Sequence, residues 1–168
     1  KFLSFKMKIL IKNGYIVNEN KIFESDILVN GELIEKIDKK ISSTDVDKVI
    51  DCNGSLILPG IIDDQVHFRE PGYPNKATIH SESRAAVAGG ITSYFEMPNT
   101  NPSTTTIESL NHKFKIASTS SLANYSFMFG GTNQNINEVK KLPEHEVPGI
   151  KLFLGSSTGN MLVDDYDV

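Results

Sequence analysis

The chain has 168 residues, of which 39% are hydrophobic and 23% are charged, and its formal net charge is −4. This composition is typical of an ordinary globular domain, and the slightly acidic balance argues against the basic surface with which proteins bind nucleic acid. The sequence has no apolar stretch near the ~18 residues of a membrane span, and its single cysteine, Cys52, excludes an intrachain disulfide. We therefore expect a cytoplasmic protein that binds neither nucleic acid nor a membrane.

The first part of the chain has the pattern of short strands and turns. Residues 1–6 (KFLSFK) lack the apolar core of a signal peptide, and Met7 begins a regular strand pattern, so we interpret 1–6 as upstream or non-native sequence. In residues 7–58, Asn-Gly pairs at 13–14, 30–31 and 53–54 separate apolar runs and are typical of tight hairpins. We predict a small antiparallel β-sheet domain over 7–58, with strands at 8–12, 15–17, 26–29, 33–37, 49–50 and 55–58.

Strand and helix patterns alternate from residue 59 onward. The predicted strands are 61–67, 91–97, 125–129 and 150–154, and the predicted helices are 78–88, 106–118 and 135–142. Thr78 is a candidate N-cap for the first helix. Such alternation implies an α/β fold with a parallel sheet built from right-handed crossovers.

These four strand–helix units correspond to half of a TIM-like (β/α)8 barrel, which needs ~250 residues. A half barrel would leave two strand edges and their apolar faces open. We therefore interpret residues 59–168 as the first half of a metal-dependent hydrolase barrel, truncated, within a longer protein. The alternative is a complete four-stranded α/β domain.

Polar side chains follow the first of these strands. If the strand alternation continues to residue 69, then Gln65, His67 and Arg69 share one face. An amide, an imidazole and a guanidinium are costly to bury without partners. Two interpretations follow: a solvated strand end, or a metal ligand beside an anion-binding arginine.

The later strands also end in polar groups. Glu96 and Asn99 lie at the end of the second strand, and Lys151 lies within the apolar run of the fourth. A buried lysine must be paired, desolvated or modified, and a neutral amine can add carbon dioxide to become a carbamate that bridges two metal ions. The alternatives are a lysine that extends to solvent or an ion pair. We assign no role to the histidines elsewhere in the chain, His80, His112 and His145.

Three segments together resemble a known family. PGIIDDQVHFREPG resembles the first-strand motif of the cyclic amidohydrolases, AAVAGGITSYFEMPNTNPST resembles their second block, and GIKLFLGSS resembles the strand that bears their carboxylated lysine. The Arg-Glu-Pro and Met-Pro-Asn-Thr blocks point to the dihydroorotase branch of the amidohydrolase superfamily, with the allantoinases close to it. The similarity covers nearly the whole chain from Met7.

The resemblance implies a zinc-dependent enzyme of pyrimidine biosynthesis that converts dihydroorotate reversibly to N-carbamoyl-L-aspartate. His67 matches a zinc ligand, Lys151 the lysine whose carbamate bridges two Zn2+ ions, and Arg69 and Asn99 the residues that hold the substrate carboxylate. Gln65 replaces the usual first histidine and is a weaker zinc ligand. The general acid/base aspartate and the remaining ligands are expected beyond Val168, so this chain alone should be inactive. The resemblance leaves a homodimer open.

Two alternatives are compatible with the same motifs. One is an allantoinase or another cyclic amidase. The other is a catalytically silent, dihydroorotase-like scaffold protein, for which Gln65 is the main support. We favour retained activity, because Arg69, Asn99 and Lys151 are all present.

Overall fold

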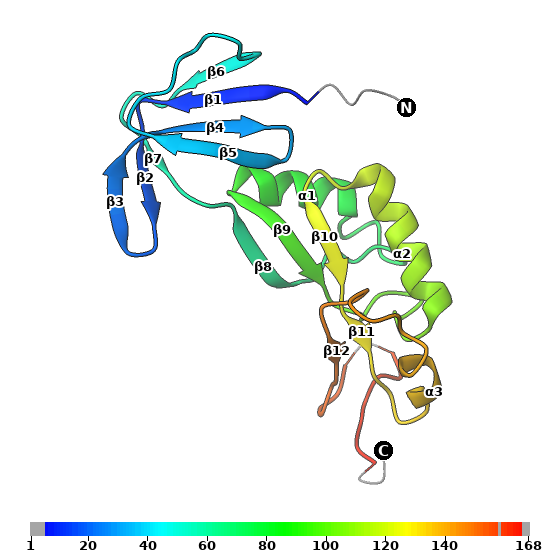
Figure 1. The fold of residues 1–168 in the computed structure, drawn as a ribbon. Coiled ribbons are helices and arrows are strands. Elements are labelled where there is room, and N and C mark those ends of the chain that lie inside the picture. Colours follow the sequence, from blue (N-terminus) through cyan, green and yellow to red (C-terminus); the bar gives the residue numbers. More distant parts are fainter. Residues whose placement is uncertain (1–5, 158, 166–168) are drawn as a thin grey trace. The chain divides into compact units, whose positions relative to one another are not determined.

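The computed structural model describes residues 6–157 and 159–165 and has a mixed α/β fold. The chain divides into two compact units, Lys1–Pro59 and Gly60–Val168. Strands occur in both units, and the helices described lie in the second (Figure 1). Every described helix is too short or too polar to cross a membrane.

The first unit contains two sheets rather than one. One sheet has the strand order β5-β4-β1-β6 and the other has the order β3-β2-β7. The pairs β1–β6 and β2–β7 are parallel and the others are antiparallel, so the prediction of a purely antiparallel sheet is wrong. The strands are β1 (Lys8–Lys12), β2 (Tyr15–Asn18), β3 (Lys21–Glu24), β4 (Asp26–Asn30), β5 (Leu33–Asp38), β6 (Lys48–Asp51) and β7 (Leu56–Ile57).

The Asn-Gly pairs of the first unit have two different roles. The pair at 30–31 joins the antiparallel strands β4 and β5, which confirms the hairpin predicted there. The pairs at 13–14 and 53–54 instead carry the chain from one sheet to the other, and the Gly54 N–H donates to the Asn13 carbonyl at 2.8 Å. Hairpins and these crossings both use positive φ, which Asn and Gly tolerate, so the dipeptide alone does not distinguish them.

Strand β3 was not predicted from the sequence. It pairs with β2 through a two-residue turn in which Glu19 and Asn20 have φ of 49° and 60°. Two consecutive positive φ values are typical of a type I′ turn, and the usual second residue there is glycine. Without that glycine, the sequence lacked the signal for a hairpin.

The second unit contains parallel strands in chain order. Strands β8, β9 and β10 form one sheet with the order β10-β9-β8, and β11 pairs with β12. This confirms the predicted parallel pairing, although the third predicted strand is divided into β10 and β11 and the fourth is shorter than expected. The elements are β8 (Ile61–Val66), α1 (Ile79–Ala88), β9 (Ile91–Glu96), α2 (Ile107–Ser120), β10 (Asn124–Phe127), β11 (Phe129–Gly130), α3 (Ile136–Val139) and β12 (Ile150–Lys151).

Threonine side chains begin the two long helices. Thr78 caps α1, as predicted, and Thr106 caps α2 in the same way. In α2 the Ser109 backbone N–H donates to Thr106 Oγ1 at 3.1 Å, and the Thr106 N–H donates to Ser109 Oγ at 3.2 Å. These capping boxes satisfy N–H groups that have no partner within the helix.

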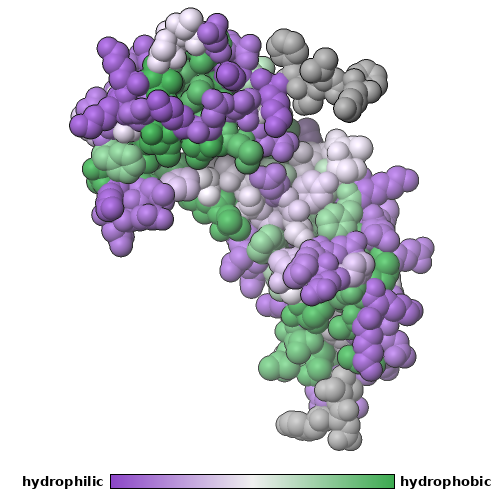
Figure 2. Space-filling view, viewed as in Figure 1, coloured by the Kyte–Doolittle hydropathy of each residue, from purple (hydrophilic) through white to green (hydrophobic). Residues whose placement is uncertain are grey.

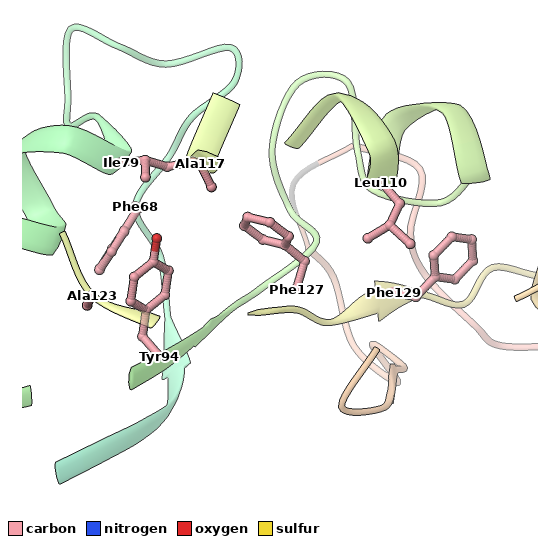
Figure 3. Close-up of a cluster of buried hydrophobic side chains, with 8 residues drawn as sticks. All are labelled: Phe68, Ile79, Tyr94, Leu110, Ala117, Ala123, Phe127 and Phe129. Atoms are coloured by element: carbon pink, nitrogen blue, oxygen red, sulfur yellow. The ribbon is translucent and has the colours of Figure 1, made fainter. Parts of the chain in front are cut away.

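The hydrophobic core of the second unit lies between its helices and its sheet (Figure 3). Helices α1 and α2 pack against each other and against β9 and β10. The Phe68 and Tyr94 rings have centroids 4.5 Å apart, so the segment that follows β8 is held in this core. The buried members of the cluster are Phe68, Ile79, Tyr94, Leu110, Ala117, Ala123, Phe127 and Phe129.

Both units also expose large apolar side chains (Figure 2). In the first unit Leu33 and Ile34 of β5 are 69% and 63% exposed, and in the second Leu154, which follows β12, is 80% exposed. Exposed apolar surface of this kind commonly marks a face that contacts other protein.

We predict that Thr106→Ala lowers the free energy of unfolding by about 1 kcal/mol, because the Ser109 N–H loses its acceptor. Thr119→Ala near the exposed end of α2 is the matched control. It removes the exposed hydrogen bond from Thr119 Oγ1 to the Ile116 carbonyl, but alanine is the better helix former, so the two effects should nearly cancel. Urea denaturation followed by circular dichroism measures both. Equal effects of the two substitutions would show that the cap contributes nothing.

Candidate active site

The ends of β8 and β9 bring two distant segments of the sequence together. Val66 pairs with Glu96 in the parallel register, and the Met97 N–H donates to the Val66 carbonyl at 2.9 Å. Carboxyl ends of parallel strands meet at the same edge of a sheet, so the segments beginning at His67 and Met97 start side by side.

His67 and Asn99 are joined at this edge. His67 Nδ1 lies 2.9 Å from Asn99 Oδ1. An amide oxygen only accepts, so Nδ1 is the donor in this hydrogen bond. The His67 ring is exposed whereas Asn99 is buried, so the bond orients an accessible imidazole from a fixed support.

Arg69 departs from the strand geometry that the alternation predicted. Strand β8 ends at Val66, and its register with β9 shifts between Asp63 and Val66. Arg69 itself has φ of +67°, in the left-handed region. The prediction that Gln65, His67 and Arg69 continue one alternating face is therefore wrong, because the chain leaves the extended conformation before residue 69.

The Arg69 guanidinium is available for a ligand. Its side chain is half-buried, and among the residues that the structure describes it makes no ion pair or hydrogen bond. A left-handed conformation of a non-glycine residue costs about 1–3 kcal/mol and is often found at functional sites. An unpaired cation in a strained loop is thus a reasonable anion-binding group.

The loops that follow β8 and β9 interlock. The Asn101 N–H donates to the Pro71 carbonyl at 3.1 Å, and a Cβ added at Gly72, where φ is +102°, would clash with Asn101. Glu70 Oε2 accepts from the Ile79 N–H at 2.7 Å, so this carboxylate binds the start of α1. Glu70 therefore has a structural role in the loop that presents Arg69.

Among the described residues, no hydrogen bond or ion pair joins Gln65 or Lys151 to the His67–Asn99 pair. Gln65 is exposed, and its backbone N–H donates to Asp63 Oδ1 at 3.1 Å. Lys151 is half-buried in β12 with Nζ 5.5 Å from the centre of the Phe153 ring, and within the described residues the ammonium has no hydrogen-bond or ion-pair partner. No three His, Cys, Asp or Glu side chains of the described residues converge as a metal site.

A buried ion pair, which the sequence analysis missed, lies behind the same strand end. Lys113 Nζ lies 2.8 Å from Glu96 Oε2, and both side chains are 1% exposed. Lys113 also donates to the Met97 carbonyl at 3.2 Å and lies 4.8 Å from the centre of the Phe127 ring. The available signal was the position of Lys113 on the apolar face of α2, three residues after Leu110.

Burial and pairing act on this ion pair in opposite directions. Burial raises the pKa of Glu96 and lowers the pKa of Lys113, while the charge of each partner opposes the shift of the other. The backbone N–H groups of Arg69 and Phe68 also lower the pKa of Glu96. Neither Glu96 oxygen meets a well-directed hydrogen-bond donor in the described part of the chain, so the short contact with Lys113 is held by charge.

Curated proteins similar to this chain are named as dihydroorotases and allantoinases. A dihydroorotase of Methanosarcina mazei is 37% identical over 158 residues, covering 94% of this chain and 34% of the relative. A dihydroorotase of Bacillus subtilis is 50% identical over 97 residues, covering 57% and 22%. An allantoinase of Desulfitobacterium hafniense is 36% identical over 146 residues, covering 86% and 32%.

Solved structures give a related result. The L-hydantoinase (dihydropyrimidinase) from Arthrobacter aurescens matches with a TM-score of 0.87 at 29% identity, covering 95% of this chain and 36% of that one. A D-hydantoinase (dihydropyrimidinase) from Thermus sp. matches with a TM-score of 0.78 at 28% identity, covering 94% and 35%. The chain thus spans between 22% and 36% of the length of these relatives.

The family to which the chain belongs follows from a match to a family model. The model described as dihydro-orotase-like matches residues 54–142, which is more than half of the chain and includes His67, Arg69 and Asn99. The chain therefore belongs to the dihydro-orotase-like family.

Proposed function

We propose that this chain is part of a dihydroorotase, which reversibly hydrolyses the ring amide of dihydroorotate to N-carbamoyl-L-aspartate. The observation that carries the proposal is the unpaired Arg69 guanidinium in the loop beside the His67–Asn99 hydrogen bond. Dihydroorotate carries an exocyclic carboxylate on the same ring as the amide that reacts. A cation and an amide donor beside an accessible imidazole match those two parts of the substrate.

Arg69 and Asn99 bind the carboxylate in this proposal. A guanidinium presents paired N–H donors in a planar arrangement that matches a carboxylate. Asn99 accepts from His67 through Oδ1, so its NH2 group can donate a hydrogen bond to the substrate carboxylate. The two side chains would hold the ring in one orientation, which is a positioning contribution to catalysis.

His67 fits the role of a zinc ligand. Its Nδ1–H is engaged by Asn99, which leaves the accessible Nε2 to bind a metal, and this is the usual arrangement of metal-binding histidines. Lys151, as a carbamate, and Gln65, through its amide oxygen, would be further ligands. A bound zinc ion supplies an acidified water and polarises a carbonyl group. Since the described residues supply a single imidazole at this edge, the other ligands and the acid/base carboxylate would come from other parts of the protein.

The second unit would be the first part of a TIM-like barrel. Its parallel strands lie in chain order with helices between them, which is how such barrels are built. The similarity to hydantoinases over about a third of their length supports this interpretation. Active sites of these barrels lie at the carboxyl ends of the strands, where His67 and Asn99 meet.

An allantoinase is the second candidate, because an allantoinase is among the relatives that cover most of this chain. Allantoin has no carboxylate, so it would leave the Arg69 guanidinium without an anionic partner. This difference favours dihydroorotate.

We predict that the full-length protein turns over dihydroorotate and N-carbamoyl-L-aspartate faster than allantoin, by at least about tenfold in kcat/KM. Removal of bound metal with a chelator should abolish turnover, and added zinc should restore it. The assays use ultraviolet absorbance for dihydroorotate and a colorimetric assay for allantoate. A preference for allantoin would identify an allantoinase, whereas a metal-free protein inactive on every substrate would support the scaffold alternative.

We predict that Arg69→Ala in the full-length protein raises the KM for N-carbamoyl-L-aspartate by about 30-fold or more, since a charged hydrogen-bonded contact contributes about 2 kcal/mol. Bound zinc, measured by atomic emission, should not change. Arg84→Ala removes an exposed arginine of α1 and is the matched control, which should behave as the wild type. Loss of zinc together with the rise in KM would show that Arg69 is a structural residue.

A further inference from the structure

Asn135 joins β11 to the loop between β9 and α2, which carries Asn99. Its Nδ2 donates to the Gly130 carbonyl at 2.8 Å and to the Thr105 carbonyl at 2.9 Å. Its Oδ1 accepts from the Thr132 N–H at 2.8 Å. One side-chain amide therefore pairs three backbone groups, and one of them belongs to the loop of the candidate site.

Backbone hydrogen bonds continue from Gly130 toward Asn99. The Gly130 N–H donates to the Thr104 carbonyl at 2.8 Å, and the Thr104 N–H donates to the Pro98 carbonyl at 2.9 Å. The Pro98 carbonyl is part of the planar peptide group that continues into Asn99. A series of printed-length contacts thus leads from the Asn135 amide to the backbone at Asn99.

The packing of β11 against this loop is close. A Cβ added at Gly130 would lie 3.0 Å from Thr105 Cγ2 and 3.2 Å from Pro98 Cβ. Strand β11 therefore approaches the residue before Asn99 at a distance that only glycine allows without adjustment. In so densely packed a contact, a displacement of Gly130 is passed on to Pro98.

The opposite side of the loop is held separately. The Asn101 N–H donates to the Pro71 carbonyl at 3.1 Å, in the segment that follows β8. Asn99 lies between this contact and the contacts to β11. Because Asn99 Oδ1 is bound to His67 Nδ1, the direction of its NH2 group depends on where the backbone holds the residue.

The stability of the core does not account for Asn135. The residue lies outside the cluster of buried apolar side chains, and it is only half-buried. Helix α3, which it precedes, contains no buried residue. The backbone groups that Asn135 binds could pair with water in its place, so its loss should loosen the loop without unfolding the unit.

We propose that Asn135 is a positioning residue for the substrate-carboxylate site, which holds β11 and the loop between β9 and α2 so that the Asn99 amide faces its ligand. This inference rests on the proposed function for the identity of the ligand. Asn135 acts through Gly130 and Thr105 and not by contact with the substrate.

The test uses the full-length protein with variants at Asn135 and at a control position. Asn135→Asp keeps the acceptor for the Thr132 N–H but loses both donated hydrogen bonds, and Asn135→Ala loses all of them. Asn137→Asp and Asn137→Ala make the same changes at an exposed position of α3. Steady-state kinetics with N-carbamoyl-L-aspartate and hydrogen exchange by mass spectrometry are measured for each.

In both Asn135 variants we expect the KM to rise at least about fivefold with a smaller change in kcat, because the Asn99 amide is no longer held toward the carboxylate. Exchange should accelerate at least about tenfold in residues 98–105 and change little in α1, since the lost contacts belong to that loop. Both Asn137 controls should match the wild type.

Three results would overturn the inference. One is Asn135→Asp with wild-type KM and wild-type exchange. Another is faster exchange in the loop with an unchanged KM. The third is exchange that accelerates equally across the whole second unit, which would mark a purely structural residue. If the wild type turns over no cyclic amide, the proposed function fails, and exchange in residues 98–105 alone then supports or overturns the role of Asn135 in holding the loop.

Discussion

The parallel pairing of β8 and β9 is the constraint on which the candidate site depends. Parallel strands cannot be joined by a tight turn, so the chain must return through α1 before the second strand begins. The result is that His67 and Asn99, which are 32 positions apart in the sequence, leave the sheet at the same edge and form a 2.9 Å hydrogen bond. An antiparallel arrangement of the same segments would place them at opposite ends of the sheet.

Charged side chains near this strand edge are paired in the core and unpaired in the loop that follows β8. Glu96 and Lys113 neutralise each other in the core, while the Arg69 guanidinium has no partner among the described residues. Removing either partner of the buried pair would leave an uncompensated charge in the core, which is strongly destabilising.

The sequence predicted well those features that depend on local chemistry or on periodicity. The alternation of strands and helices indicated the parallel sheet, and Thr78 marked the start of α1. Prediction from the sequence failed where one local sequence pattern is compatible with two structures. At Asn13, the Asn-Gly pair that is typical of a hairpin instead connects strands of two different sheets. Prediction also failed where a distant partner decides the outcome: Lys113 is buried in contact with Glu96, to which no short motif connects it.

Asn99 shows why the chemical type of a single side chain matters at this edge. Its amide oxygen accepts from the imidazole, and its NH2 group remains to donate, so the same residue can orient a ring and bind an anion. An aspartate at this position could accept from His67, but it would repel a substrate carboxylate. A serine could donate or accept through one short hydroxyl, which could not easily reach both partners. The planar amide, buried between two interlocked loops, combines both functions in a fixed orientation, and that links the direction of the His67 ring to the site that would recognise the substrate.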